Sequence, residues 1–253
     1  VLLSGKIYLR MSKWRITREN PYVHILEFHL PIKNYEKIED KLDEDRIIRI
    51  KTGVYNKTLA KGKEPTCEIG ERTLSKYGVK CAPDRRTAKV INVYKIVKTA
   101  AEKFNIPVPK IVISNTMMPN AAATGPSPSR GVILITTGLL AQLEDDEILS
   151  VVGHELGHLK GRDPLYLFAL TSGEFVLRLT VFLPFFLFSP FLYLLVALTI
   201  VYFIAKFFET RADLLSAMKI GKPQALAESL MKIGFRKLQY ERIPSYRLRG
   251  WLS

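Results

Sequence analysis

The most regular pattern of polar and apolar positions lies between residues 147 and 160. Apolar side chains recur there three or four residues apart: Ile148, Val152, Leu156 and Leu159. This spacing predicts an amphipathic helix from Glu147 to Lys160 with one side against a core. The acidic run Glu144-Asp145-Asp146 precedes it, and negative charge is favourable at a helix N-terminus.

A second pattern is continuously apolar. Leu179 to Ala205 contains no charged residue, and about 20 apolar residues suffice for a helix to span a bilayer. Pro184 and Pro190 interrupt the run, and proline tends to break a helix. We therefore expect two helices, Pro164 to Leu183 and Phe191 to Phe208, that form a transmembrane hairpin. The alternatives are a shallow re-entrant hairpin and an unusually apolar hairpin on a soluble protein.

Shorter patterns surround these two segments. The predicted strands are Tyr22–Leu30, Arg46–Ile50, Lys110–Ser114 and Gly131–Thr136, with Asn120–Thr124 as a further edge strand. The other predicted helices are Asn34–Leu42, a helix capped by Asp84 that runs to Phe104, the continuation of the helix after Asp213 to about Ile220, and Gln224–Gln239. The fold class is therefore α+β, mostly α, with a small β-sheet.

The first helix carries candidate chemistry. His154-Glu155-Leu156-Gly157-His158 is an H-E-x-x-H motif, and the chain has only four histidines. Histidines four residues apart lie on the same helix face, where their neutral rings can share one zinc ion. Glu155 is placed to take a proton from a water molecule at the metal. The motif predicts a zinc peptidase with one Zn²⁺ per chain, and its ligand types favour zinc over calcium or magnesium.

A hydrolytic zinc site needs a third protein ligand. No histidine follows His158, so a carboxylate is expected, and Glu209 and Asp213 share one face of a later helix. Glu209 would bind the metal, and Asp213 would accept the second ring N–H of a zinc histidine. The alternative is a solvated charge pair with Arg211 and Lys206.

Three segments together resemble the HtpX-like integral-membrane zinc metallopeptidases, a family that includes the type 1 CAAX prenyl proteases. They are Asn120–Gly125, the histidine pentad with Asp163 after it, and Phe208–Asp213, in the family's order. The resemblance covers roughly residues 84–240 and implies a zincin-like (gluzincin) catalytic core. It implies that Glu209 is the third ligand and that Asp213 is an outer partner of the metal ligands. Substrate binding would fall to the strand Asn120, Ala121, Ala122, Ala123 and Thr124.

One family element is altered here. Members usually carry His-Pro and a basic residue beyond the third ligand, whereas this chain has Ile243 before the proline of its nearest match. The group that stabilises the tetrahedral intermediate is therefore open, with Tyr240, Tyr246 and Arg247 as candidates.

Topology follows from the ligands. The histidines and Glu209 must lie on the same side of the membrane to share one ion, which requires an even number of crossings. Positive charge flanks both predicted spans at Lys160, Arg162, Lys206 and Arg211, and basic residues mark the cytosolic side. We expect a multi-pass protein of the cell membrane with a cytosolic catalytic face.

The net charge of +14 is large, but no nucleic-acid-binding module is present. A basic domain held against anionic lipid is the simpler explanation. A basic surface without a partner is the alternative. Cys67 and Cys81 are too few for a four-cysteine zinc site and are expected to be free thiols.

The expected organisation has an appended segment of unknown role at 1–66, two parts of the catalytic core at 67–163 and 209–253, and the hairpin at 164–208. The predicted function is hydrolysis of polypeptides, in particular of membrane or misfolded proteins in quality control. A CAAX-type prenyl-protein protease and a non-catalytic membrane scaffold are the alternatives. The sequence does not indicate an oligomeric state.

Overall fold

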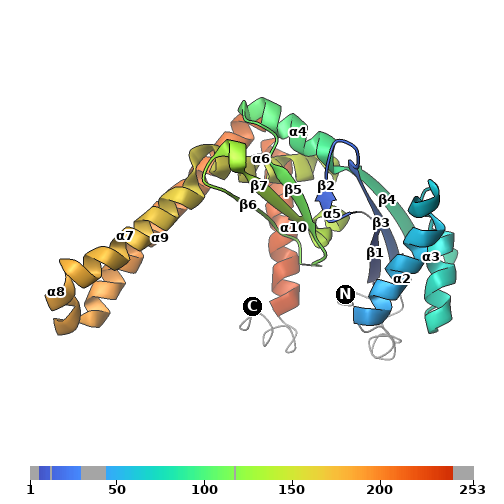
Figure 1. The fold of residues 1–253 in the computed structure, drawn as a ribbon, viewed down its shortest axis with the longest axis horizontal. Coiled ribbons are helices and arrows are strands. Elements are labelled where there is room, and N and C mark those ends of the chain that lie inside the picture. Colours follow the sequence, from blue (N-terminus) through green and yellow to red (C-terminus); the bar gives the residue numbers. More distant parts are fainter. Residues whose placement is uncertain (1–5, 12, 30–43, 117, 242–253) are drawn as a thin grey trace.

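Residues 6–11, 13–29, 44–116 and 118–241 are described by the computed structural model (Figure 1). They are mostly helical and include two small sheets, so the predicted α+β class with predominant helix is confirmed. The structure has three regions: a helical arm that projects at one end, a central sheet with its helices, and a second sheet at the other end.

The central sheet has the order β2-β5-β7-β6. Its strands are β2 (Arg15–Ile16), β5 (Lys110–Ser114), β7 (Val132–Thr136) and β6 (Ala121–Thr124). Strands β5 and β7 are parallel, and β2 and β6 pair antiparallel at the two edges. The strand predictions at 110–114, 120–124 and 131–136 are therefore confirmed, and β6 lies on the open edge that the sequence suggested.

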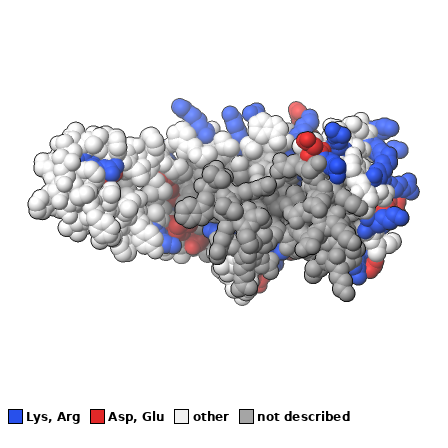
Figure 2. All heavy atoms as spheres, turned by 90° about the horizontal axis from the view of Figure 1, so that it is seen from below, with Lys and Arg blue, Asp and Glu red and all other residues white. Residues whose placement is uncertain are grey.

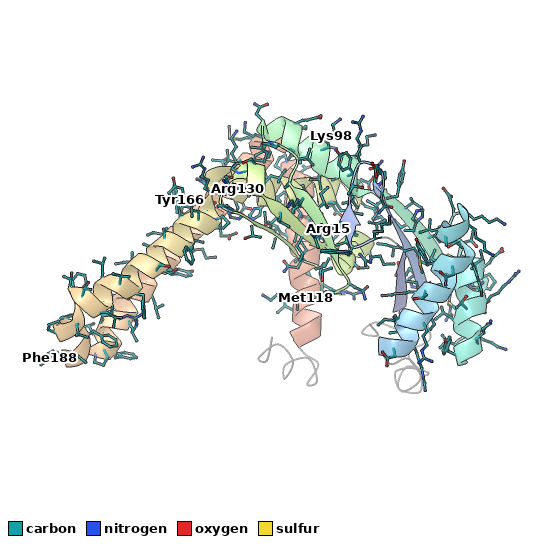
Figure 3. The ribbon with its side chains drawn as sticks, in the orientation of Figure 1. Arg15, Lys98, Met118, Arg130, Tyr166 and Phe188 are labelled. Atoms are coloured by element: carbon teal, nitrogen blue, oxygen red, sulfur yellow. The ribbon has the colours of Figure 1, made fainter. Side chains whose placement is uncertain are left out.

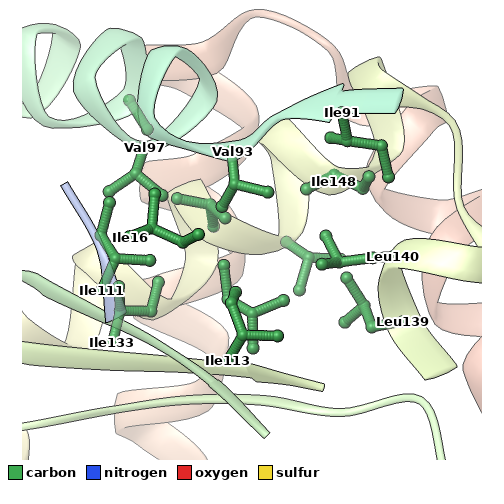
Figure 4. Packing of buried hydrophobic residues seen from close by; sticks show 14 of the residues in the cluster. Ile16, Ile91, Val93, Val97, Ile111, Ile113, Ile133, Leu139, Leu140 and Ile148 are labelled. Atoms are coloured by element: carbon green, nitrogen blue, oxygen red, sulfur yellow. The ribbon is translucent and has the colours of Figure 1, made fainter. Parts of the chain in front are cut away.

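Helices α4 (Val93–Phe104), α5 (Thr137–Gln142) and α6 (Asp145–Gly161) share one hydrophobic core with this sheet (Figure 4). Ile111 and Ile113 project from β5 into that core, where Val97 and Ile148 of the helices are also buried. The helix predicted at 147–160 is confirmed as α6. Glu144 and Glu147 cap its first turn reciprocally, since the Glu144 N–H donates to Glu147 Oε2 at 2.8 Å.

The second sheet has the order β1-β3-β4, all antiparallel. Its strands are β1 (Lys6–Met11), β3 (Tyr22–His29) and β4 (Arg86–Asn92). Val23 and Ile25 of β3 join the main core, whereas Leu26 and Phe28 join a second core under α2 (Glu44–Lys57) and α3 (Cys67–Leu74). The segment 1–66 is thus joined to the later part of the chain by strand pairing, β2 with β5 and β3 with β4. Short 3-10 turns occupy Leu59–Lys61, Ser75–Tyr77, Pro83–Arg85 and Pro128–Arg130.

Two element predictions in this region were wrong. The segment predicted as the strand Arg46–Ile50 lies inside α2, where Ile47, Ile50 and Val54 form a buried face with helical spacing. The helix expected from Asp84 begins only at Val93. Residues 86–92 pair with β3 instead, and Asn92 caps α4 by accepting from the Lys95 N–H at 2.9 Å. The strand predicted at Tyr22–Leu30 is confirmed as β3, and the helix predicted at Asn34–Leu42 lies outside the described residues.

The arm consists of α7 (Asp163–Thr180), the short α8 (Leu183–Phe188) at its tip, and α9 (Pro190–Ile220), which returns beside α7 (Figure 1). The predicted pair of helices is present, with the break between them at residues 181–189. Helix α9 continues without interruption from the arm to Ile220, as predicted for the residues after Asp213. Helix α10 (Pro223–Glu241) follows it.

The surface of the arm is apolar (Figure 2). Large apolar side chains are exposed along its whole length, and Phe188 at the tip is 90% exposed. Within the described part of the chain, α9 is the single helix that is long and apolar enough to cross a membrane. Helix α7 carries Asp163, Glu174 and Arg178, the last two joined by an ion pair of 3.4 Å.

Candidate metal centre and active site

Two helices bring three candidate ligands together. His154 and His158 project from α6, and their Nε2 atoms lie 3.1 Å apart. Glu209 of α9 places its two carboxylate oxygens 3.5 Å from His154 Nε2 and 3.7 Å from His158 Nε2. Among the residues that the structure describes, these three form the one group of His, Cys, Asp or Glu side chains whose donor atoms are close enough to hold a metal ion.

Small residues allow this approach of α9 to α6. A Cβ atom at Gly157 would lie 3.2 Å from the Cα atom of Ala212, and one at Gly153 would lie 2.5 Å from Ile220 Cγ1. Ser216 is fully buried in the same contact and donates from its hydroxyl to the Ser150 carbonyl at 2.8 Å. The close approach of α9 to α6 therefore depends on small residues of both helices.

We expect Gly157→Val to separate the two helices. A side chain there must displace the backbone of α9, so the variant should lose about 1–3 kcal/mol of stability and bind less metal, because Glu209 moves away. Gly234→Val is the matched control, since no atom lies within 4 Å of a Cβ at that glycine. Thermal unfolding and metal content are measured for both variants; a Gly157→Val protein with normal metal content would contradict the role of this contact.

Each histidine has a carboxylate at its other ring nitrogen. Asp213 Oδ1 lies 2.7 Å from His154 Nδ1, and Asp163 Oδ2 lies 2.9 Å from His158 Nδ1. His158 can donate its ring N–H to Asp163, which leaves its Nε2 atom free to face the ion, and the Asp213 carboxylate beside His154 Nδ1 favours the same arrangement of that ring. Both imidazoles are thus oriented for metal binding.

Asp163 is the outer carboxylate whose role the sequence did not indicate. It is almost completely buried, and Arg211 of α9 forms an ion pair with its second oxygen. A buried carboxylate is stable only when it is paired, and here both oxygens have partners. Arg162, which adopts a left-handed conformation at φ 56°, turns the chain between α6 and α7 and returns Asp163 toward His158.

We expect Asp213→Asn to weaken metal binding by about 10- to 100-fold, the usual effect of removing an outer partner of a metal ligand. The measurement is a competition titration against a zinc-binding indicator. Asp84→Asn, at an exposed aspartate far from the site in the chain, is the control. Equal affinities in the two variants would show that Asp213 does not hold His154 in place.

Glu155 lies beside the candidate ligands and contacts the edge strand. Its Oε2 atom accepts a hydrogen bond from the Ala123 N–H at 2.8 Å. Burial raises the pKa of the Glu155 carboxyl to about 7, which suits a residue that must both accept and donate a proton near neutral pH. Burial, followed by the proximity of His158, lowers the pKa of His154 and favours the neutral ring that a metal requires.

The edge strand β6 has backbone groups available for a partner. Asn120 faces β7, because its N–H donates to Thr136 Oγ1 and its carbonyl accepts from the Thr136 N–H. Since backbone direction alternates along a strand, Ala121 and Ala123 direct their N–H and C=O groups away from the sheet. Ala123 uses its N–H for Glu155, and the groups of Ala121 face the open edge.

A cavity of about 340 Å³ joins these parts. Its lining combines residues of β6, the ligand residues and the base of the arm: Ala121, Ala122, Ala123, His154, Glu155, His158, Asp163, Pro164, Leu167, Ala205, Phe208 and Glu209. The cavity therefore borders both the edge strand β6 and the candidate metal ligands.

The donor set fits zinc. Two neutral ring nitrogens and one carboxylate are the protein ligands of many hydrolytic zinc sites, which leave a further position open. A carboxylate lies at each Nδ1 atom, hydrogen-bonded in the case of His158, as is usual for the outer partners of such a set. The residues present are therefore suited to one Zn²⁺.

The profile of Peptidase family M48, a family of metallopeptidases, matches residues 87–247, which is more than half of the chain. The chain belongs to this family. The matched M48 region contains both ligand helices, the edge strand and the arm between them, so the predicted resemblance to HtpX-like metallopeptidases is confirmed.

Individual relatives with similar sequences are named as proteases. The chain is 30% identical over 174 residues to a protease HtpX homolog of Gemmatimonas aurantiaca, covering 60% of this chain and 61% of that protein. It is 36% identical over 157 residues to one of Pyrococcus abyssi, with 54% of each chain covered. A third, of Thermodesulfovibrio yellowstonii, is 42% identical over 92 residues, 36% of this chain and 32% of the relative. The matches thus cover less than two thirds of each relative's length.

The structure places most of the site residues that the sequence predicted. The structure brings His154, His158 and Glu209 together, places Asp213 at His154, and sets Glu155 against the strand 120–124. Of the candidates for stabilising the tetrahedral intermediate, Tyr246 and Arg247 lie outside the described residues, as does the side chain of Tyr240.

Proposed function

We propose that this M48 chain is a membrane-bound, zinc-dependent endopeptidase. The observation that carries the proposal is the convergence of two histidine nitrogens and the Glu209 carboxylate beside Glu155, which is itself hydrogen-bonded to an edge strand. A ligand group, a buried proton acceptor and a surface for an extended chain thus meet in one cavity. We further propose that the central region is a zincin-like (gluzincin) core.

His154, His158 and Glu209 would hold the zinc ion, which when bound polarises the scissile carbonyl and acidifies a water molecule. Glu155 takes the proton of the attacking water on its carboxylate and returns it to the leaving amine. Asp213 and Asp163 keep the two imidazole rings in place. The open N–H and C=O groups of β6 align the substrate as an additional strand.

The arm supports a membrane location. From Pro190 to Lys206, α9 is roughly 25 Å long at about 1.5 Å per residue, close to the roughly 30 Å of a bilayer's apolar core. Its apolar surface faces away from the rest of the protein, and exposed apolar area of this extent requires lipid or a protein partner. We propose that α7 and α9 enter and leave the bilayer as a hairpin, so that both ligand segments stay on one side.

The distribution of Lys and Arg residues favours the cytosol as the side of the membrane on which the metal ligands lie. Four basic residues lie at the base of the arm: Lys160, Arg162, Lys206 and Arg211. The one basic residue toward its tip, Arg178, is paired with Glu174. Lys and Arg side chains also gather at the end of the molecule opposite the arm (Figure 2). Cleavage of membrane or misfolded proteins in quality control is the biological role proposed.

The test is cleavage by the purified chain in detergent. We expect digestion of casein, loss of digestion after removal of metal with phenanthroline, and its return with stoichiometric Zn²⁺. Digestion that persists in the metal-free protein would contradict the proposal. No observation favours the two alternatives: the presence of Glu155 supports a peptidase over a scaffold, and the described residues give no indication of a prenyl-protein substrate.

A further inference from the structure

The base of the arm forms one wall of the catalytic cavity. Its contributions to the lining are Pro164 and Leu167 of α7 and Ala205 and Phe208 of α9. Ala205 precedes Glu209 by four residues and therefore lies about one helical turn, or roughly 6 Å, nearer the tip of the arm. The cavity thus extends from the metal centre toward the apolar part of the arm, and the side chains at that end are apolar.

Tyrosine and lysine mark the level at which the arm becomes apolar. Tyr166 lies near the base and Phe188 at the tip (Figure 3). The Tyr166 ring is 6.5 Å from the Phe208 ring, and the Lys206 ammonium lies 5.9 Å from the centre of the Tyr202 ring. Tyrosine is enriched at membrane–water interfaces, and Lys206 ends the uncharged run of the arm, where its ammonium requires water or headgroups.

The metal centre lies close to this level. Glu209 follows Lys206 by three residues, about 5 Å along α9. Each headgroup layer of a bilayer is roughly 5–7 Å thick. The ligand group is therefore at the height of the headgroups, and a substrate in the cavity must lie against the bilayer surface.

We propose that the substrates are polypeptide segments that leave the bilayer within a few residues of the bond to be cleaved, and that an apolar side chain beside that bond enters the space between Leu167 and Ala205. This inference rests on the proposed function, because it requires the arm to be in the membrane. An extended chain advances about 3.3 Å per residue, so roughly two to four residues connect the apolar boundary to the reacting bond.

The chemistry of the wall agrees with this assignment. Leu167 and Phe208 present apolar surface, and the small side chain of Ala205 leaves space beside them. A polar or charged side chain in that space would lose its hydration without gaining a partner. An apolar side chain is stabilised there, because the cavity wall and the adjoining lipid both shield it from water. The membrane-proximal position and the apolar preference therefore have one cause, the use of the arm's base as a wall.

A spacer series tests the position. The chain is placed in liposomes with single-span substrates in which one cleavable peptide follows the span directly or after a helical spacer of up to about 20 residues, which holds the peptide roughly 30 Å away. We expect the cleavage rate to fall at least about tenfold across the series. Equal rates would overturn the inference. The same peptide, free in detergent, reports the protease itself: if it too is uncleaved, the proposed function fails instead.

Two variants test the wall. Ala205→Phe fills the space, and we expect it to reduce cleavage beside large apolar residues of a peptide library by about tenfold or more relative to cleavage beside alanine. Leu198→Phe puts the same side chain on a 65% exposed position of α9 and should leave the preference unchanged. If Ala205→Phe cleaves no peptide, Leu167→Ala decides, because the enlarged space must shift the preference toward larger residues. An unchanged preference in either active variant would overturn the assignment.

Discussion

Glu155→Gln is expected to abolish peptide cleavage while the metal stays bound. Glutamine has nearly the same shape and can still accept from the Ala123 N–H, but it cannot take a proton from water. General-base catalysis contributes about 10²–10⁴-fold to rate. We expect a loss at the upper end because the other two carboxylates of the lining, Asp163 and Glu209, already lie against the histidines. Metal content and peptide hydrolysis are measured on the same preparation.

Glu102→Gln is the matched control, since Glu102 is an exposed carboxylate that pairs only with Lys98 on α4. That variant should retain full activity. A Glu155→Gln protein that cleaves at the normal rate would eliminate Glu155 as the proton acceptor. Loss of metal together with activity would mean instead that Glu155 helps to form the metal centre.

Glu209→Ala is expected to have the second large effect. The change removes one of three ligands, so the loss of zinc affinity should exceed the roughly 100-fold upper value for outer partners. The two histidines keep their positions, because Asp213 and Asp163 still hold their Nδ1 atoms. We therefore expect a folded protein with little bound zinc and no activity at ordinary metal concentrations.

Glu228→Ala controls for the loss of a carboxylate from the same part of the chain, because Glu228 is exposed on α10. Circular dichroism establishes folding, and zinc affinity is measured by competition. Unaltered affinity in Glu209→Ala would mean that the third ligand is another residue.

The local parts of the site were predictable from the sequence. Helix α6 has regular apolar spacing and acidic residues at its start, so its position and the side-by-side arrangement of His154 and His158 follow from helix geometry. Glu209 and Asp213 share a face for the same reason. The arm was predictable because an uncharged run of this length is rare in soluble proteins, and its two prolines indicate where one helix ends and the next begins.

The parts that depend on distant contacts were not predictable. Asp163 reaches His158 only because Arg162 adopts a left-handed conformation, and a non-glycine residue gives no signal for it. Residues 86–92 form a strand because β3 lies beside them, although their composition also suits a helix. The role of Gly157 depends on which helix packs against it. In each case the partner is far away in the sequence.

The most direct test of the metal centre is zinc-edge X-ray absorption on the purified chain, together with its zinc content. His154, His158 and Glu209 predict one zinc per chain, surrounded by nitrogen and oxygen at about 2.0–2.2 Å. Absence of stoichiometric metal, or sulfur scattering at about 2.3 Å from a site at Cys67 and Cys81, would contradict a centre shared by helices α6 and α9.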